Sequence, residues 1–373
     1  MKCLAPLKRV VDLIGPGLVT AAVVLGPGSI TVASKSGALM GCSILWAVVA
    51  ASVMMAAYTH AGARIGMTAG APLLTVVART RGRWLAALMG LAAFCICVGF
   101  QTGDNVGVGI ALAEMFGMSM NFWSVVFTIV ALGLLWGSRS LYQAVERLMM
   151  VLVAVMIAAF FGNLLMVRPS PSEVLNGLVP SKPAVFGLVV AVSATTFSVA
   201  AAAFQAYLVQ SKGWTPGDLK KGFRDSIVGI AALGAISCVI MITSATVLRP
   251  AGIKVNTAVD MALQLEPLLG ASAKWLFLTG LWAGAFSSFV VNAMVGGALL
   301  ADGLGLGGRL DSFWAKVLAS VVMLLGTAAA WIFGANPIQL LILAQCATML
   351  GAPIIAAVIC MLANNRAIMG SKM

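Results

Sequence analysis

Apolar segments follow one another through the whole chain, each close to the roughly 20 residues that a membrane-spanning helix needs. Apolar residues make up 61% of the 373 residues and charged residues 9%, whereas soluble domains carry about 25% charged residues. The sequence therefore predicts an all-α integral membrane protein. Its ten transmembrane segments are expected near residues 12–37, 41–65, 84–115, 121–138, 145–167, 184–211, 222–248, 272–301, 313–334 and 338–363.

The basic residues indicate how the chain crosses the membrane. With the N-terminus inside, 17 of the 23 Lys and Arg residues fall in inner connections and 6 in outer ones. The positive-inside rule then favours a multi-pass protein of the plasma (inner) membrane with both termini cytoplasmic. The net charge of +12 is thus explained by topology, and we expect lipid rather than nucleic acid around this protein.

Two of the apolar segments contain residues that disfavour a continuous helix. Gly26, Pro27 and Gly28 interrupt the first segment. We expect a second interruption in the sixth segment, near Ala200 to Gln205. Backbone groups freed at membrane depth must face protein or a water-filled cavity. Broken helices at matching positions of two halves are typical of the binding site of a transporter.

A Pro-rich connection divides the chain into two halves of five segments each. An odd number of spans inverts the second half relative to the first, which predicts two inverted repeats. The prolines exclude a long helix in the connection and predict an extended linker. We expect residues 1–167 to form the first repeat, 168–183 an extracellular linker, and 184–373 the second repeat with a short C-terminal tail.

Short motifs in a specific order span nearly the whole chain. They are Gly15-Pro-Gly17, Gly26-Pro-Gly-Ser29, Arg64-Ile-Gly-Met-Thr68, Tyr142-x-x-x-Glu146, Asn176-Gly-Leu-Val-Pro180, Leu343-Ala-Gln345 and Asn364-Asn-Arg-Ala-Ile-Met-Gly370. In combination they resemble the Nramp family of proton-coupled Mn²⁺ and Fe²⁺ importers. The resemblance implies a LeuT-type fold with ten helices in two inverted five-helix repeats, in which helices 1 and 6 are broken.

The resemblance also implies which residues line the site, and several of them depart from the family pattern. In helix 1, Gly26 and Ser29 replace the Asp and Asn of the family's Asp-Pro-Gly-Asn signature. In helix 6, the family's Met-Pro-His is replaced by Ala203, Phe204 and Gln205. The implied substrate-binding set is Gly26, Pro27, Gly28, Ser29, Ala200, Ala203, Phe204, Gln205 and the unchanged Gln345. The implied coupling-ion or proton path is Gln101, Asp104 and Gln210.

These departures leave two hypotheses for the substrate. Helices 1 and 6 offer no thioether, imidazole or carboxylate at the site, which argues against direct coordination of bare Mn²⁺ or Fe²⁺. The first hypothesis is a small anion such as bicarbonate, bound by helix N-termini and by the donors Ser29, Gln205 and Gln345. The alternative is a hydrated divalent cation such as Mg²⁺, with Asp104 supplying the negative charge. The sequence favours the anion, coupled to Na⁺ or H⁺.

Other functional classes find little support in the sequence. No nucleophile–base pair, metal cluster or phosphate-binding loop stands in a plausible context, so we expect a transporter and not an enzyme. We further expect a monomer without a resident cofactor, its only bound ions being the substrate and a coupling Na⁺ or H⁺.

Overall fold

The computed structural model describes residues 26–137 and 139–369, and within these ranges the regular secondary structure is entirely helical. The first half of the first predicted segment, before residue 26, lies outside the described residues. In the first half of the chain the helices are α3 (Pro27–Met40), α4 (Leu45–Thr68), α5 (Leu73–Arg81), α6 (Arg83–Phe116), α7 (Met120–Trp136) and α8 (Arg139–Val167).

The second half of the chain contains more helices because two of its spans are broken. The long helices and their parts are α10 (Phe186–Thr196), α11 (Val199–Ser211), α12 (Leu219–Val247), α15 (Ala273–Leu304), α16 (Phe313–Phe333), α17 (Pro337–Thr348) and α18 (Ala352–Ala363). The short elements are α9 (Pro171–Gly177), α13 (Ala258–Ala262), α14 (Glu266–Leu269), α19 (Arg366–Met369) and three 3₁₀ turns at Pro216–Asp218, Leu263–Leu265 and Gly270–Ser272.

The predicted membrane segments are present as helices. Eight helices or helix pairs in the described residues are long and apolar enough to cross a membrane. The fourth segment is the shorter apolar helix α7, and α3 is the described part of the first. The amphipathic helix α5 between the second and third spans was not predicted. It carries Arg79 and Arg81 in its last turn.

Three local expectations are corrected by the structure. The sixth span breaks at Phe197 and Ser198 rather than within 200–205, because Ala200 to Ala203 are the strongest helix formers and continue α11. The tenth span, expected to be continuous, is interrupted between α17 and α18. The linker 168–183 is not wholly extended, since Pro171 begins the seven-residue helix α9. The division into repeats at this linker stays a prediction.

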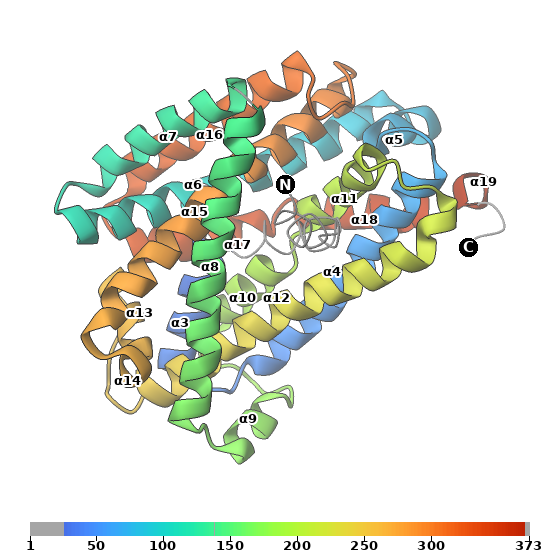
Figure 1. The fold of residues 1–373 in the computed structure, drawn as a ribbon. Coiled ribbons are helices and arrows are strands. Elements are labelled where there is room, and N and C mark those ends of the chain that lie inside the picture. The colour runs from blue at the N-terminus through green and yellow to red at the C-terminus, as the bar shows by residue number, and fades with distance from the viewer. Residues whose placement is uncertain (1–25, 138, 370–373) are drawn as a thin grey trace, which may run out of the picture.

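The helices pack in two groups that meet at α3 and α17. In one group α6 lies along α15, with α16 and α7 beside them; in the other, α4 packs against α11 and α12 (Figure 1). Glycines permit the close approach of α4 to α11, because a Cβ atom built at Gly62 or Gly66 would overlap or crowd the backbone of Ala202 and Ala206. Since α3 contacts α12, α6 and α17, its first turn lies where the two groups meet.

Candidate functional site

The first turn of α3 is buried in the interior of the molecule. Gly26 is the N-cap residue in an extended conformation (φ −96°, ψ −176°), and Pro27 occupies the first helical position, where its missing N–H costs nothing. Gly28 and Ser29 follow, and all four residues are buried. Among the described residues no side chain caps this helix end, and its first-turn N–H groups carry the positive end of the helix dipole.

A carboxylate from the third span lies beside this helix end. A Cβ atom built at Gly26 would stand 3.3 Å from Oδ1 of Asp104 on α6 and 3.5 Å from Oγ of Ser288 on α15. The other oxygen of Asp104, Oδ2, accepts a hydrogen bond of 2.7 Å from Nδ2 of Asn292. Asp104 is only 2% exposed. The acidic group therefore reaches the position toward which a side chain at residue 26 would project.

The tenth span contributes Gln345 to the same place. Its Nε2 fills the space at Gly28, where an added Cβ would overlap it, and lies 3.1 Å from a Cβ built at Gly103 of α6. Gln345 is buried, and its Oε1 has no hydrogen-bond partner within the described residues. Glycines on two helices thus make room for this amide. The structure brings together Gly26, Gly28, Asp104 and Gln345, and it adds Asn292.

The predicted residues of the sixth span lie farther along α11 than expected. Ala200, Ala203, Phe204 and Gln205 are all buried inside the helix rather than at its break. Phe204 stacks with Tyr207 at a centroid distance of 6.1 Å. Phe197 and Ser198 occupy the break itself. Their only signal in the sequence is the group of short polar residues around them.

The other residues of the predicted coupling path are separated from one another. Gln101 packs against Gly326 of α16, and both polar atoms of its side chain are buried without a partner in the described structure. Gln210 lies near the end of α11, where its Nε2 donates to the carbonyl oxygens of Gly66 (3.0 Å) and Ala71 (2.6 Å). Gln210 thus fastens α11 to the end of α4.

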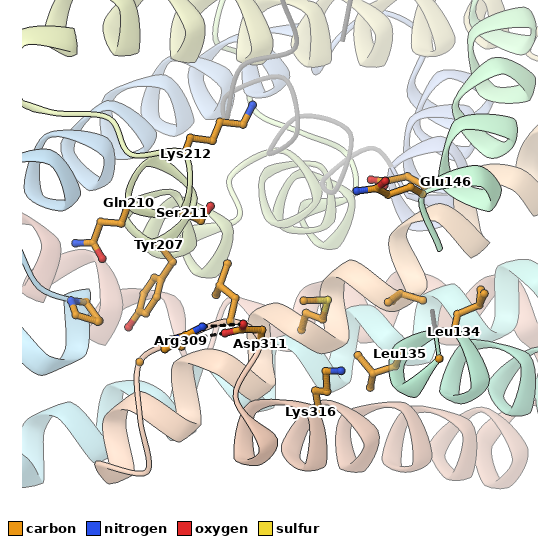
Figure 2. A pocket seen from close by; sticks show the side chains of 17 residues that line it. Leu134, Leu135, Glu146, Tyr207, Gln210, Ser211, Lys212, Arg309, Asp311 and Lys316 are labelled. Carbon is orange, nitrogen blue, oxygen red and sulfur yellow. Dashed lines mark hydrogen bonds and ion pairs between the residues drawn. The ribbon is translucent and has the colours of Figure 1, made fainter. Parts of the chain in front are cut away.

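A cavity of about 830 Å³ opens on the side that the charge distribution predicts to be cytoplasmic. Figure 2 shows Tyr207 and Gln210 on one side of it and Glu146 on the opposite side. Among the charged lining residues, Arg309 and Asp311 form an ion pair of 3.0 Å, and Asp311 raises the pKa of the Arg309 guanidinium through this hydrogen bond. The lining is Pro72, Leu134, Leu135, Gly137, Gln143, Glu146, Tyr207, Gln210, Ser211, Lys212, Val290, Met294, Gly308, Arg309, Leu310, Asp311 and Lys316.

The donor set at the site is made of oxygen and nitrogen atoms. Within residues 26–137 and 139–369, no group of three or more His, Cys, Asp or Glu side chains is placed to hold a metal ion. Asp104 supplies a carboxylate at the end of α3. Gln345 places its Nε2 at Gly28, and its Oε1 is buried without a partner in the described structure. Such a site can bind a cation through one charge and a few neutral oxygens, with water completing the coordination.

Comparison with known proteins shows which family and which relatives the chain resembles. The family model described as natural resistance-associated macrophage protein-like matches residues 17–373. A divalent metal cation transporter MntH of Mycobacterium tuberculosis (strain ATCC 25618 / H37Rv) is 27% identical over 372 residues, covering 96% of this chain and 84% of the relative. The MntH of Chromohalobacter salexigens is 26% identical, with coverages of 96% and 84%.

Solved structures agree with the fold. The manganese transporter of Eremococcus coleocola, in complex with an aromatic bis-isothiourea compound, superposes with a TM-score of 0.79 at 16% identity, covering 96% of this chain and 80% of that one. The structure of MhsT in complex with L-phenylalanine gives a TM-score of 0.60 at 18% identity, with coverages of 91% and 87%.

Fold and site together define a polytopic membrane transporter of the LeuT type, which confirms the expected fold class. The match over nearly the whole length narrows this class further. The chain belongs to the natural resistance-associated macrophage protein (Nramp) family, whose relatives here are transporters and not enzymes.

Proposed function

We propose that this Nramp family member transports a divalent cation, bound with part of its water shell, by alternating access. The observation that carries the proposal is the buried carboxylate of Asp104 beside Gly26 at the N-terminal end of α3. Two like unit charges about 4 Å apart repel by ~4 kcal/mol at an effective dielectric constant of about 20. An ionised Asp104 therefore attracts a cation to this position and repels an anion.

The chemistry of the donors favours a hard cation. Asp104 and Gln345 offer oxygen atoms, and the described site residues supply no thioether or imidazole, which are the groups that hold softer transition metals. Mg²⁺ keeps several of its waters and is often bound through one or two carboxylates. The relatives named as divalent metal cation transporters and the Eremococcus coleocola manganese transporter support a divalent substrate. We therefore place hydrated Mg²⁺ first and Mn²⁺ second.

The remaining features fit an alternating-access cycle. We infer that the ion is held between the first turn of α3 and the scaffold helices α6 and α15, and that it leaves through the inner cavity. Asp104 is the group that can exchange a coupling H⁺ or Na⁺ for the substrate. The proposal includes cytoplasmic termini and a monomeric transporter in the plasma membrane.

A small anion such as bicarbonate is the second candidate, and one observation favours it. Gly26 and Ser29 place no charged side chain at the end of α3, so the described part of this span offers no counter-charge to the helix dipole. Anion binding then requires Asp104 to be protonated, so that it donates a hydrogen bond instead of repelling the substrate. Asp104 would keep this proton through the cycle, so that the anion enters without it and makes the vesicle interior alkaline.

The test uses purified protein in liposomes with parallel dyes for internal Mg²⁺ and internal pH. We expect saturable Mg²⁺ entry that Asp104→Asn abolishes, with no bicarbonate-dependent alkalinisation. Bicarbonate-dependent alkalinisation without any Mg²⁺ or Mn²⁺ signal would contradict the cation proposal and establish the second candidate. Vesicles without protein and vesicles with the Asn variant supply the two baselines.

A further inference from the structure

A buried carboxylate at the inner end of α15 joins three elements. Asp302 is 1% exposed and accepts four hydrogen bonds. Two come from the backbone N–H groups of Leu74 and Thr75 (both 3.0 Å), one from Oγ1 of Thr75 (2.5 Å), and one from the hydroxyl of Tyr207 (2.5 Å). An ionised carboxylate accepts about four hydrogen bonds, so Asp302 is fully satisfied.

Three of these four donors belong to the first turn of α5. Leu74 and Thr75 lie in the first turn of α5, whose N–H groups have no partner within the helix. Asp302 caps them from another helix and meets the positive end of the α5 dipole. The hydroxyl of Tyr207 also accepts a hydrogen bond of 3.2 Å from the N–H of Leu74. Asp302, α5 and Tyr207 thus form one connected unit, which we name the inner clasp.

A second attachment lies one turn farther along α11. Gln210 donates to the carbonyl oxygens of Gly66 and Ala71, so α11 is fastened to the end of α4 as well as to α5. Residues three positions apart share one face of a helix, and both Tyr207 and Gln210 line the inner cavity (Figure 2). This face of α11 therefore forms one wall of the cavity, and its hydrogen bonds attach it to α4, α5 and α15.

We propose that the inner clasp holds the inner cavity open by keeping α11 against α5 and α15. Glu146 of α8 lines the cavity opposite this wall (Figure 2). In this proposal the cavity closes when α11 moves toward α8. That movement would take the Tyr207 hydroxyl away from Asp302, and a buried carboxylate that loses a donor is destabilised. The clasp therefore biases the transporter toward the conformation that is open on this side, whichever ion is carried.

The test measures access to the cavity. A cysteine placed at Met294, a lining residue on α15, is labelled with a maleimide supplied from the cavity side of inside-out vesicles. In this background Tyr207→Phe removes the hydroxyl and keeps the ring that stacks on Phe204. We expect the labelling rate to fall about tenfold, within the range of ordinary coupling between conformational states. The exposed native cysteines Cys95 and Cys360 are replaced by Ala in every variant, so that the maleimide reports on position 294. Tyr58→Phe is the matched control, because its hydroxyl contacts the described part of the chain only at residue 360 near the surface, and it should leave the rate within about twofold.

A purely structural role for Tyr207 makes a different prediction. It would lower the melting temperature of the detergent-solubilised protein and leave the labelling rate of the folded fraction unchanged, and that result would overturn the proposal. Should Tyr207→Phe fail to fold, Thr75→Val serves instead, because it removes one of the four hydrogen bonds to Asp302 and leaves α11 intact. A smaller fall in the labelling rate is then expected, and an unchanged or faster rate refutes the clasp.

Discussion

Replacing Asp104 by Asn removes the buried negative charge beside Gly26 and leaves the shape of the side chain unchanged. The amide oxygen can still accept the hydrogen bond from Asn292, so the packing of α6 on α15 is preserved. A unit charge about 4 Å away contributes ~4 kcal/mol at an effective dielectric constant of about 20, and a divalent ion feels it twice. Even ~2 kcal/mol, left after screening by bound water, raises Kd about 30-fold.

Calorimetric titration of purified protein with Mg²⁺ measures this loss directly. Wild-type protein and Asp104→Asn are compared at equal folded fraction, judged by size exclusion and thermal melting. We expect the variant to lose at least about 30-fold in affinity while keeping its melting temperature within a few degrees. Equal Mg²⁺ affinity in the two proteins would show that Asp104 is not part of the cation site and would refute the reasoning.

Three further variants at the end of α3, with one control variant in α7, test the geometry of this helix end. Gly26→Asp places a second carboxylate beside the first; we expect tighter Mg²⁺ binding in titrations, whereas an anion site would instead lose bicarbonate flux. Gly28→Ala forces a Cβ atom into the amide of Gln345, and we expect a loss of ~1–3 kcal/mol of stability together with loss of flux. Gly133→Ala is the control, because the structure leaves open space at this position in α7. It should stabilise the protein by ~0.5–1 kcal/mol in thermal melts. Asn292→Ala removes the donor to the Asp104 carboxylate on α6 and should reduce Mg²⁺ flux without abolishing binding; unaltered flux would argue against a positioning role.

The membrane spans could be predicted from the sequence because hydropathy over a bilayer-length window is a local property. The same reasoning found the end of α3, since Gly26 and Pro27 act on their own backbone. The same reasoning misplaced the break in the sixth span. It matched this span to the broken helix of the first half and gave too little weight to the helix propensity of Ala200 to Ala203. It missed α5, whose nine residues are too short and too polar to resemble a span.

The contacts that define the site could not be predicted from the sequence. Asp104 and Gly26 are 78 positions apart (104 − 26), and their proximity depends on how α6 packs against α3. The same holds for Gln345 at Gly28 and for Asp302 at the start of α5. The sequence identified Asp104 as an intramembrane carboxylate of functional interest, yet favoured an anion because the first and sixth membrane spans place no acidic group at their breaks. In the structure the negative charge at the site comes from Asp104 on α6, and for this reason we place the cation hypothesis first.

The sign of the charge that moves with the substrate tests the central claim most directly. Proteoliposomes adsorbed on a solid-supported membrane are exposed to a step of Mg²⁺, and then to a step of bicarbonate, at constant pH and ionic strength. A cation site at Asp104 predicts a saturable inward positive current with Mg²⁺ that disappears in Asp104→Asn, and no response to bicarbonate. A silent Mg²⁺ step, with bicarbonate alone producing current or internal alkalinisation, would contradict the account.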